Sequence, residues 1–261
     1  MGKYDSSKTR VKPVFDCIFE NQNRNASILK RLLSLPQRKA LKFDLNNFVV
    51  GELIEKHWGE NEIKLNAPKG LLLWLVKNLK MPPTGMPKAS LATQQKRLGL
   101  IRNEDSIIQE ALKLILENPS ITKKWFVLEG TTQPDVYLET ENCIIVIEGK
   151  RTERKPTTST QWMHVRHQMI RHIDAVWDLK AAKRIFGFFV VEAENINSLV
   201  LKKWLEYSEL TTNDEILKKS LPHRSQQQRE QIAESFLGVT TWQAICNEFD
   251  ISIHLLPNEV K

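Results

Sequence analysis

Residues 133–150 constrain the fold of this chain more than any other stretch. Within them, the run 143–147 is apolar throughout, mostly β-branched and too short for a typical helix. A run that is apolar on both faces indicates a strand buried on both sides. The stretch 136–138 is also apolar, and the turn-like Glu-Thr-Glu-Asn sequence of residues 139–142 joins it to the longer run. The sequence therefore predicts a β-hairpin with one deeply buried strand.

Charged residues stand at the ends of these two predicted strands. Glu148 and Lys150 close the buried strand, and Asp135 opens its partner. Side chains at positions i and i+2 of a strand point to the same side, so Glu148 and Lys150 share a face beside Asp135. Two carboxylates and one ammonium suit a hard divalent cation and a phosphate group. The alternative is a surface hairpin with a solvated, charged end.

The spacing of these residues resembles a known nuclease signature. Pro134 and Asp135, a separation of thirteen residues, and then Glu148, Gly149 and Lys150 are similar to the PD-(D/E)xK motif of the restriction-endonuclease-like nuclease superfamily. The resemblance implies an α/β fold whose core is a mixed central sheet flanked by helices. It also implies metal-assisted hydrolysis of phosphodiester bonds.

The resemblance, which covers roughly residues 100–192, assigns roles to the motif. Asp135 and Glu148, with the carbonyl of Gly149, would hold Mg²⁺ or Mn²⁺. Lys150 would orient or deprotonate the attacking water, or stabilise the pentavalent phosphate, and a simple salt bridge to the acids is its alternative. The middle position of the motif is often apolar, and glycine here suits a strand end that a substrate backbone approaches closely.

A predicted helix over residues 103–116 supplies a further acid. Asn103 suits its N-cap, and at about 100° per residue Glu104 projects into the apolar stripe, whereas Glu110 points away. In nucleases of the resembled type, a helix before the first strand often lends an acid to the metal site, which makes Glu104 the candidate. The alternative is an acid that favours the positive end of the helix dipole.

A second predicted helix, over residues 161–179 and capped by Thr160, follows the motif. Its polar arc comprises Gln161, His164, Gln168, Arg171 and His172. The resemblance implies that Gln168 contacts substrate or metal-bound water and that Arg171 and His172 are phosphate ligands. The helix histidines lack the i, i+4 spacing of a zinc site, so we expect none. A solvated helix face is the alternative.

Basic residues elsewhere predict contacts with a phosphate backbone. The loop 151–160 lies next to the predicted site and carries Arg151, Arg154 and Lys155. The net charge of +7 comes from residues 1–88, which hold 16 Lys and Arg against 8 Asp and Glu. The acid-free stretch between residues 21 and 43 contains Arg24, Lys30, Arg31, Arg38, Lys39 and Lys42. We expect this stretch to follow a phosphate backbone. The alternative for the loop 151–160 is an exposed loop without a ligand, and the alternative for the stretch 21–43 is a solvated helix face.

The proline-rich segment 81–87 cannot continue a helix and marks the predicted domain boundary. Residues 1–88 are predicted to be a basic, mainly helical region, and residues 89–261 a nuclease-like domain. In the first region we expect helices over residues 14–35, 46–58 and 69–79. In the second we further expect strands over 125–128, 185–191 and 251–255, helices over 196–210 and 225–237 with Gly238 as the stop, and a short helix capped by Thr240 or Thr241.

The cysteine content and the apolar runs bear on the compartment in which the protein is expected. Three widely spaced cysteines without a CxxC motif favour a reducing compartment over a disulfide framework or a zinc site. The start has no apolar h-region and the longest apolar run is 71–76, so we expect neither secretion nor a membrane span, and a cytoplasmic location.

The resemblance thus implies a Mg²⁺-dependent DNA endonuclease, and it also allows a homodimer. The alternative is a catalytically silent nucleic-acid-binding subunit of a defence or recombination complex. Motif and charge do not separate DNA from RNA.

Overall fold

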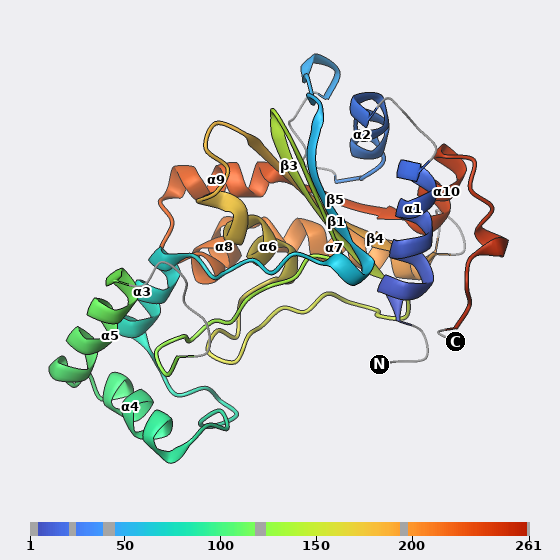
Figure 1. Cartoon of the computed structure of the whole chain (residues 1–261). Helices are drawn as coiled ribbons and strands as arrows, with labels where there is room; N and C mark the ends of the chain where they lie inside the picture. The colour runs from blue at the N-terminus through green and yellow to red at the C-terminus, as the bar shows by residue number, and fades with distance from the viewer. Residues whose placement is uncertain (1–4, 21–24, 39–44, 118–123, 194–197, 260–261) are drawn as a thin grey trace.

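The computed structural model of the chain describes residues 5–20, 25–38, 45–117, 124–193 and 198–259 and has an α/β architecture (Figure 1). One mixed sheet has the strand order β1-β2-β3-β4-β5. Its strands are β1 (Leu53–Trp58), β2 (Val136–Thr140), β3 (Cys143–Lys150), β4 (Arg184–Val191) and β5 (Phe236–Thr241). Strands β1 to β3 pair antiparallel, and β3 to β5 pair parallel. The predicted α/β class, with a mixed sheet flanked by helices, is confirmed.

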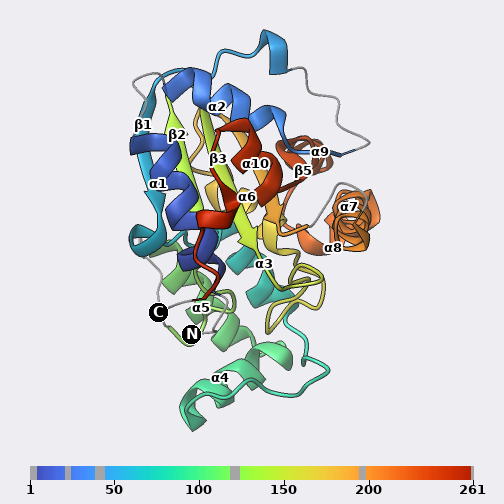
Figure 2. The same cartoon turned by 90° about the vertical axis from the view of Figure 1, so that its right-hand side faces the viewer.

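Helices cover both faces of the sheet (Figure 2). They are α1 (Lys12–Glu20), α2 (Asn25–Ser34), α3 (Lys69–Asn78), α4 (Leu91–Ile101), α5 (Asp105–Glu117), α6 (Gln168–Trp177), α7 (Leu199–Thr211), α8 (Asp214–Ser220), α9 (Gln226–Ser235) and α10 (Trp242–Glu248). Helices α1, α2 and α10 pack on one face, and α6 to α9 pack on the other. Within the described ranges, no helix has the length and apolar character needed to cross a bilayer.

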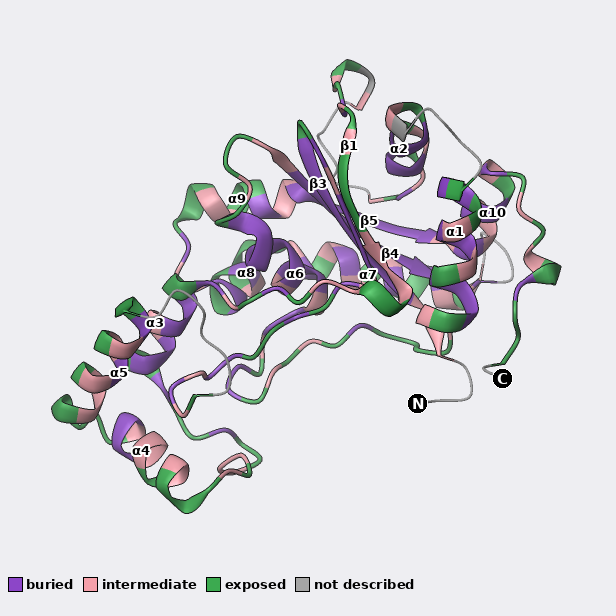
Figure 3. Cartoon of the chain, viewed as in Figure 1, coloured by how far each residue is buried: buried purple, intermediate pink, exposed green. Residues whose placement is uncertain are grey.

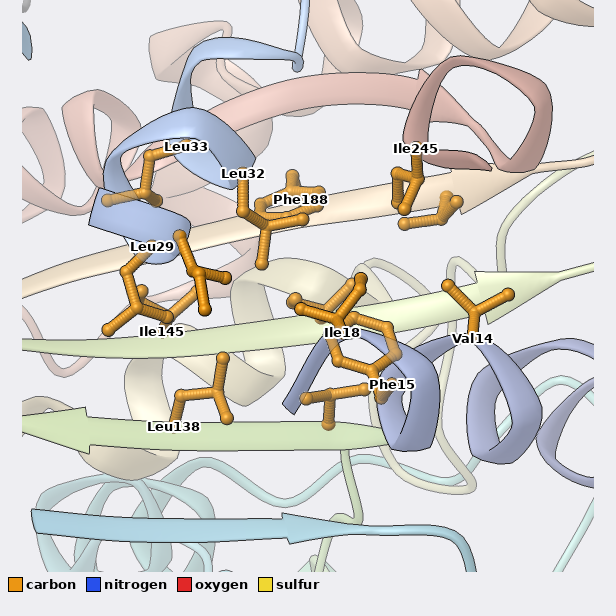
Figure 4. Close-up of a cluster of buried hydrophobic side chains, with 14 of the residues drawn as sticks. Val14, Phe15, Ile18, Leu29, Leu32, Leu33, Leu138, Ile145, Phe188 and Ile245 are labelled. Carbon is orange, nitrogen blue, oxygen red and sulfur yellow. The ribbon is translucent and has the colours of Figure 1, made fainter. Parts of the chain in front are cut away.

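Strand β3 is the centre of the sheet and confirms the predicted hairpin. It pairs with β2 through Val136 opposite Ile147, and it runs beside β4 along its whole length. Ile145 projects toward Leu29 of α2, as Figure 4 shows, whereas Val146 faces the α6 side. Both faces of the strand are therefore apolar, and β2 to β5 are buried almost throughout, whereas the edge strand β1 is partly exposed (Figure 3).

The expected helix over residues 46–58 is wrong. Leu45–Asn47 is a short 3₁₀ helix, and Leu53–Trp58 forms the edge strand β1, which pairs with β2. Pairing gives the free edge of β2 its backbone hydrogen bonds, a tertiary gain that overrides the local helical pattern. Because α1 and α2 share a core with β2 and β3, the expected division at residue 88 cuts through one hydrophobic core.

A helical insertion, α3 to α5, lies between β1 and β2 and stands to one side of the sheet (Figure 1). It has its own apolar cluster, which includes Leu72, Ala111 and Phe126. The strand expected over residues 125–128 is wrong, because Phe126 and Leu128 lie in turns and loops that pack into this cluster. Asn103 does not cap α5. It has a left-handed φ of 57° between α4 and α5, a conformation that asparagine tolerates.

Helix α6 begins at Gln168, seven residues later than expected. The preceding segment makes its backbone hydrogen bonds across a loop: Arg166 donates to the carbonyl of Thr158 at 2.8 Å, and Gln168 donates to that of Thr157 at 2.9 Å. Thr160 donates its N–H to the carbonyl of Met163, so it is not the helix cap. A helix over these residues would break those bonds.

The C-terminal elements also differ from the prediction in part. The predicted strand over 185–191 and the cap of α10 are confirmed, since Thr241 Oγ1 accepts from the N–H of Ala244. Gly238 does not stop a helix but lies within β5 with φ 103°, where the Gln37 carbonyl oxygen leaves no room for a Cβ. The strand expected over 251–255 is wrong, because Ile253–Leu255 is a 3₁₀ helix.

The contact between α6 and the sheet depends on a glycine in β4. A Cβ on Gly187 would lie 2.8 Å from both Ile173 Cδ1 and Met169 Sδ. We expect Gly187→Ala to lower the free energy of unfolding by about 1–3 kcal/mol, because α6 must move away from the strand. Urea denaturation measures the loss. Gly130→Ala is the control, since a Cβ there has no neighbour within 4 Å; equal losses in the two variants would contradict this packing account.

Candidate active site

Asp135, Glu148 and Lys150 converge where β2 begins and β3 ends. Asp135 directly precedes β2, and Glu148 and Lys150 lie two residues apart in β3. Lys150 Nζ donates to Glu148 Oε1 at 2.9 Å, and the backbone N–H of Gly149 donates to Asp135 Oδ2 at 2.7 Å. The structure thus brings together the three side chains that strand periodicity predicted.

Gly149 lies where other side chains of the protein leave no room for a Cβ atom on β3. A Cβ there would lie 2.7 Å from Trp242 Cζ2 and 2.8 Å from Val11 Cγ2. Trp242 also donates its indole N–H to the carbonyl of Lys150 at 3.2 Å. The close approach is therefore made by the chain's own side chains, rather than by the substrate backbone that the sequence led us to expect.

Two side chains of α6 hold the buried carboxylate of Glu148. Gln168 Nε2 donates to its Oε1 at 2.6 Å, and His172 Nε2 lies 3.0 Å from its Oε2. Both residues belong to the predicted polar arc, whose i, i+4 spacing aims them at the same strand. Of the other arc members, Gln161 and His164 lie before the helix starts.

The sequence predicted His172 to be a phosphate ligand, but in the structure its buried ring contacts Glu148. Its side chain is 1% exposed, and its Nδ1 lies 2.9 Å from Thr132 Oγ1. Because a carboxylate only accepts, Nε2 carries the proton toward Glu148, and in the neutral ring Nδ1 accepts the hydroxyl proton of Thr132. This chain of contacts fixes the imidazole and, through it, one oxygen of Glu148.

The pKa values of the two acids shift in opposite directions. Burial raises the pKa of Asp135 well above its usual value, the negative charge of Glu148 raises it further, and the Gly149 N–H and Lys150 offset this only in part. Burial also opposes ionisation of Glu148, but the His172 hydrogen bond and the Lys150 charge hold its pKa below the usual value. Glu148 is therefore the ionised partner, and Asp135 retains its proton to higher pH.

Lys150 keeps its positive charge. Burial lowers its pKa, but the charge and hydrogen bond of Glu148 outweigh burial, so the pKa is raised. An amine with a raised pKa donates hydrogen bonds and positive charge at neutral pH, and it is a poor proton acceptor. A raised pKa suits charge stabilisation, one of the roles that the sequence left open for Lys150, better than deprotonation of water.

A third carboxylate near the site, Glu62, was not predicted. It follows the 3₁₀ helix after β1, and its Oε1 accepts from Ser7 Oγ at 2.9 Å. Burial and then Glu148 raise the pKa of Glu62, and Glu62 in turn raises that of Asp135, so the three acids act on one another. No motif marks this position in the sequence, and the strand that precedes it was predicted to be a helix.

Glu104, the acid that the sequence favoured, is not at the site. It lies between α4 and α5, with its side chain 48% exposed and 3.9 Å from Arg102 Nη1. This junction belongs to the helical insertion (Figure 1). The expectation of an acid from the helix before β2 is therefore corrected: the additional carboxylate, Glu62, comes from the segment that follows β1 and its 3₁₀ helix.

The residues present fit a divalent cation of the Mg²⁺ type. Across the described ranges, no three Asp, Glu, His or Cys side chains form a complete metal-binding group. Mg²⁺, however, needs only one or two carboxylates, with water and phosphate completing its shell. The neighbouring Asp135 and Glu148 disfavour each other's ionisation, and Gln168 Oε1 is buried without a hydrogen-bond partner in the described structure. Asp135 and Glu148 are the residues that would hold the cation; the Gly149 carbonyl remains a predicted ligand.

The basic residues near the motif divide into two kinds. Arg151 donates to the Asn258 carbonyl at 2.6 Å and to Thr9 Oγ1 at 3.1 Å. Arg171 donates to the carbonyls of Gly130 and Thr131, both at 2.8 Å. These two guanidinium groups bind the chain itself. The other two predicted phosphate contacts, Arg154 and Lys155, are exposed.

The basic N-terminal stretch is not gathered at the site. Arg31 pairs with Glu248 at 2.6 Å, and Arg38 donates to the carbonyl of Ala233. The Gln37–Val239 bridge puts this segment beside β5, and β4 separates β5 from β3. Lys30 is exposed on α2, and Arg24, Lys39 and Lys42 lie outside the described residues.

The chain matches no family model, no curated protein and no solved structure in comparisons with known proteins. The sequence motif and the site geometry are therefore what bear on function.

The raised pKa of Asp135 has a measurable consequence. Since the folded state binds this proton more tightly than the unfolded state, the contribution of Asp135 to the free energy of unfolding falls as pH rises from about 4. Asp135→Asn removes that penalty and keeps an oxygen for the Gly149 N–H. In EDTA, we expect it to melt higher than the wild type at pH 7.5, by about 2–4 °C for each kcal/mol regained.

Thermal melts from pH 3 to 8 test this, and the advantage should shrink toward pH 3. Asp214→Asn, at an exposed position of α8, is the control and should bring no gain. A melting temperature of Asp135→Asn at or below that of the wild type at pH 7.5 would contradict the coupling of the two acids.

Proposed function

We propose that the protein is a metal-dependent DNA endonuclease with a restriction-endonuclease-like core. The observation that carries the proposal is the convergence of Asp135, Glu148 and Lys150 on one side of adjoining strand ends. The order of a β-hairpin, the strand of the motif, a helix and a parallel strand supports it, as that order is what the resembled core requires.

The side chains of the site have separable tasks. When bound by Asp135 and Glu148, a divalent cation would supply a water of lowered pKa and positive charge beside the scissile phosphate. Lys150, as an ammonium ion, stabilises the negative charge that develops on the phosphate oxygens. Gln168 and His172 orient Glu148, and Thr132 orients His172. Glu62 adds negative charge that favours cation binding at the same place.

One observation favours the alternative, a catalytically silent nucleic-acid-binding subunit. Glu148 Oε1 already accepts from both Lys150 and Gln168, and its Oε2 contacts His172. A carboxylate held so fully by the chain can serve the fold alone. Cleavage assays separate the two functions.

The decisive assay follows labelled linear, single-stranded and branched DNA with Mg²⁺ or Mn²⁺ and with EDTA. We expect metal-dependent cutting by the wild type, reduced about 100-fold or more in Lys150→Ala, because one charge-stabilising donor is typically worth that much. Lys77→Ala, at an exposed position of α3, is the control and should cut at the wild-type rate. Absence of cutting, with salt-sensitive binding by all three proteins, would favour the silent binding subunit.

The correction from Glu104 to Glu62 provides a matched pair of variants. We expect Glu62→Gln to reduce metal-dependent cleavage by about tenfold or more, the scale of losses around metal ligands. Glu104→Gln should retain the wild-type rate, because that side chain is exposed and lies in the helical insertion between α4 and α5. Rates are compared at equal Mg²⁺ after circular dichroism has shown both variants to be folded. Equal rates for the two variants would exclude a role for Glu62 in cleavage.

A further inference from the structure

A cleft of about 700 Å³ lies between α4 and the chain segment that leads into β2. Its lining residues come from α4 and from the loops that precede and follow the helical insertion and the motif. Six of its lining residues carry the inference: Lys64, Arg97, Lys124, Trp125, Gln133 and Gln161. None of them was among the residues predicted to bind nucleic acid.

The backbone joins this cleft to the candidate site. Leu65 and Thr132 exchange two hydrogen bonds of 2.8 Å in antiparallel fashion. This pairing places Lys64 beside Gln133, and Gln133 is only two residues from Asp135. Thr132 also contacts His172, which holds Glu148. A ligand in the cleft therefore lies against the segment that carries Asp135.

The positive charge of the cleft favours an anionic ligand. Three lining residues are cationic, and no Asp or Glu is among its described lining residues. Arg97 is half-buried: its Nε donates to the Trp125 carbonyl at 3.1 Å, and no carboxylate in the described ranges pairs with its guanidinium. Burial lowers the pKa of Arg97 without any acid to offset it. Lys64 and Lys124 are exposed and likewise have no ion pair with a described residue.

We propose that this cleft binds a single-stranded segment of the DNA substrate and leads it toward Asp135 and Glu148. The inference rests on the proposed function and specifies the form of its substrate. Phosphates of the strand lie against Lys64, Arg97 and Lys124, and a base stacks on Trp125. Gln133 and Gln161 supply hydrogen-bonding groups beside the strand.

Two properties favour a single strand over a duplex. A volume of about 700 Å³ is typical of pockets that enclose small ligands, so a flexible strand can place a nucleotide inside it, whereas a stiff duplex cannot bend into it. Trp125 is partly exposed, and Lys96 Nζ lies 4.8 Å from its ring centroid. An aromatic ring among cations is the usual combination of single-strand binding surfaces, where bases stack on aromatic rings and phosphates follow basic groups.

Fluorescence anisotropy tests the proposal. The probe is a fluorescein-labelled oligothymidylate of twelve nucleotides, and the full chain is titrated into it in EDTA. We expect Lys64→Gln/Lys124→Gln to raise Kd about tenfold and to reduce the slope of log K against log salt by about 1.4, since each phosphate contact on a single strand contributes about 0.7. The matched control is Lys77→Gln/Lys202→Gln, which removes the same charge from exposed positions outside the cleft. It should bind as the wild type does.

Trp125 is tested by a pair of substitutions at unchanged charge. Trp125→Leu should raise Kd about tenfold without altering the salt slope, and Trp125→Phe should restore most of the affinity because a ring remains for stacking. Thermal melts establish that both variants are folded. Wild-type affinity in a folded Trp125→Leu would overturn the stacking contact.

The proposal as a whole is overturned if the cleft and control double variants bind alike, or if the wild type binds a blunt duplex as tightly as the single strand. The proposed nuclease function is tested separately, by measuring DNA cleavage by the wild type with Mg²⁺. Cleft-dependent binding without cleavage supports the cleft and rejects the nuclease. Cleavage, combined with binding that does not depend on the cleft residues, would contradict only the proposed role of the cleft.

Discussion

The buried carboxylate of Glu148 is the constraint on which the rest of the site depends. A charge inside a sheet is costly unless hydrogen bonds and opposite charge surround it. Lys150 supplies the charge from the same strand, and Gln168 and His172 supply hydrogen bonds from α6. Helix α6 must therefore hold a fixed position over β3. The glycine at position 187 in β4 leaves room for the α6 side chains Met169 and Ile173 to approach the sheet.

A second buried ionic cluster holds the segment that leads into α6. Arg166 Nη2 lies 2.8 Å from both Glu129 and Asp174, and Arg224 Nε lies 2.8 Å from Asp174. Burial opposes ionisation of Asp174, but the surrounding cations hold its pKa well below the usual value. The cluster ties the approach to β2, the start of α6 and the α8–α9 connection together.

Sequence reasoning succeeded where the decisive interactions are local. The apolar run before Glu148 predicted β3 because a strand buried on both faces has no polar alternation. Strand and helix periodicity then aligned Glu148 with Lys150, and Gln168 with His172. It failed for Glu62 and for the start of α6, because pairing with β2 and the fixing of Arg166 involve partners far away in the chain.

By itself, the sequence determined the central hairpin, the acids and lysine at its ends and the apolar faces of the helices, because these follow from residue spacing. Only the tertiary structure decided which helices cover which face, that β1 completes the sheet and that Arg31 and Arg38 bind within the fold. It also decided that Lys64, Arg97 and Lys124 share one cleft. The physical reason is that long-range packing and pairing choose among local patterns that are nearly equal in free energy.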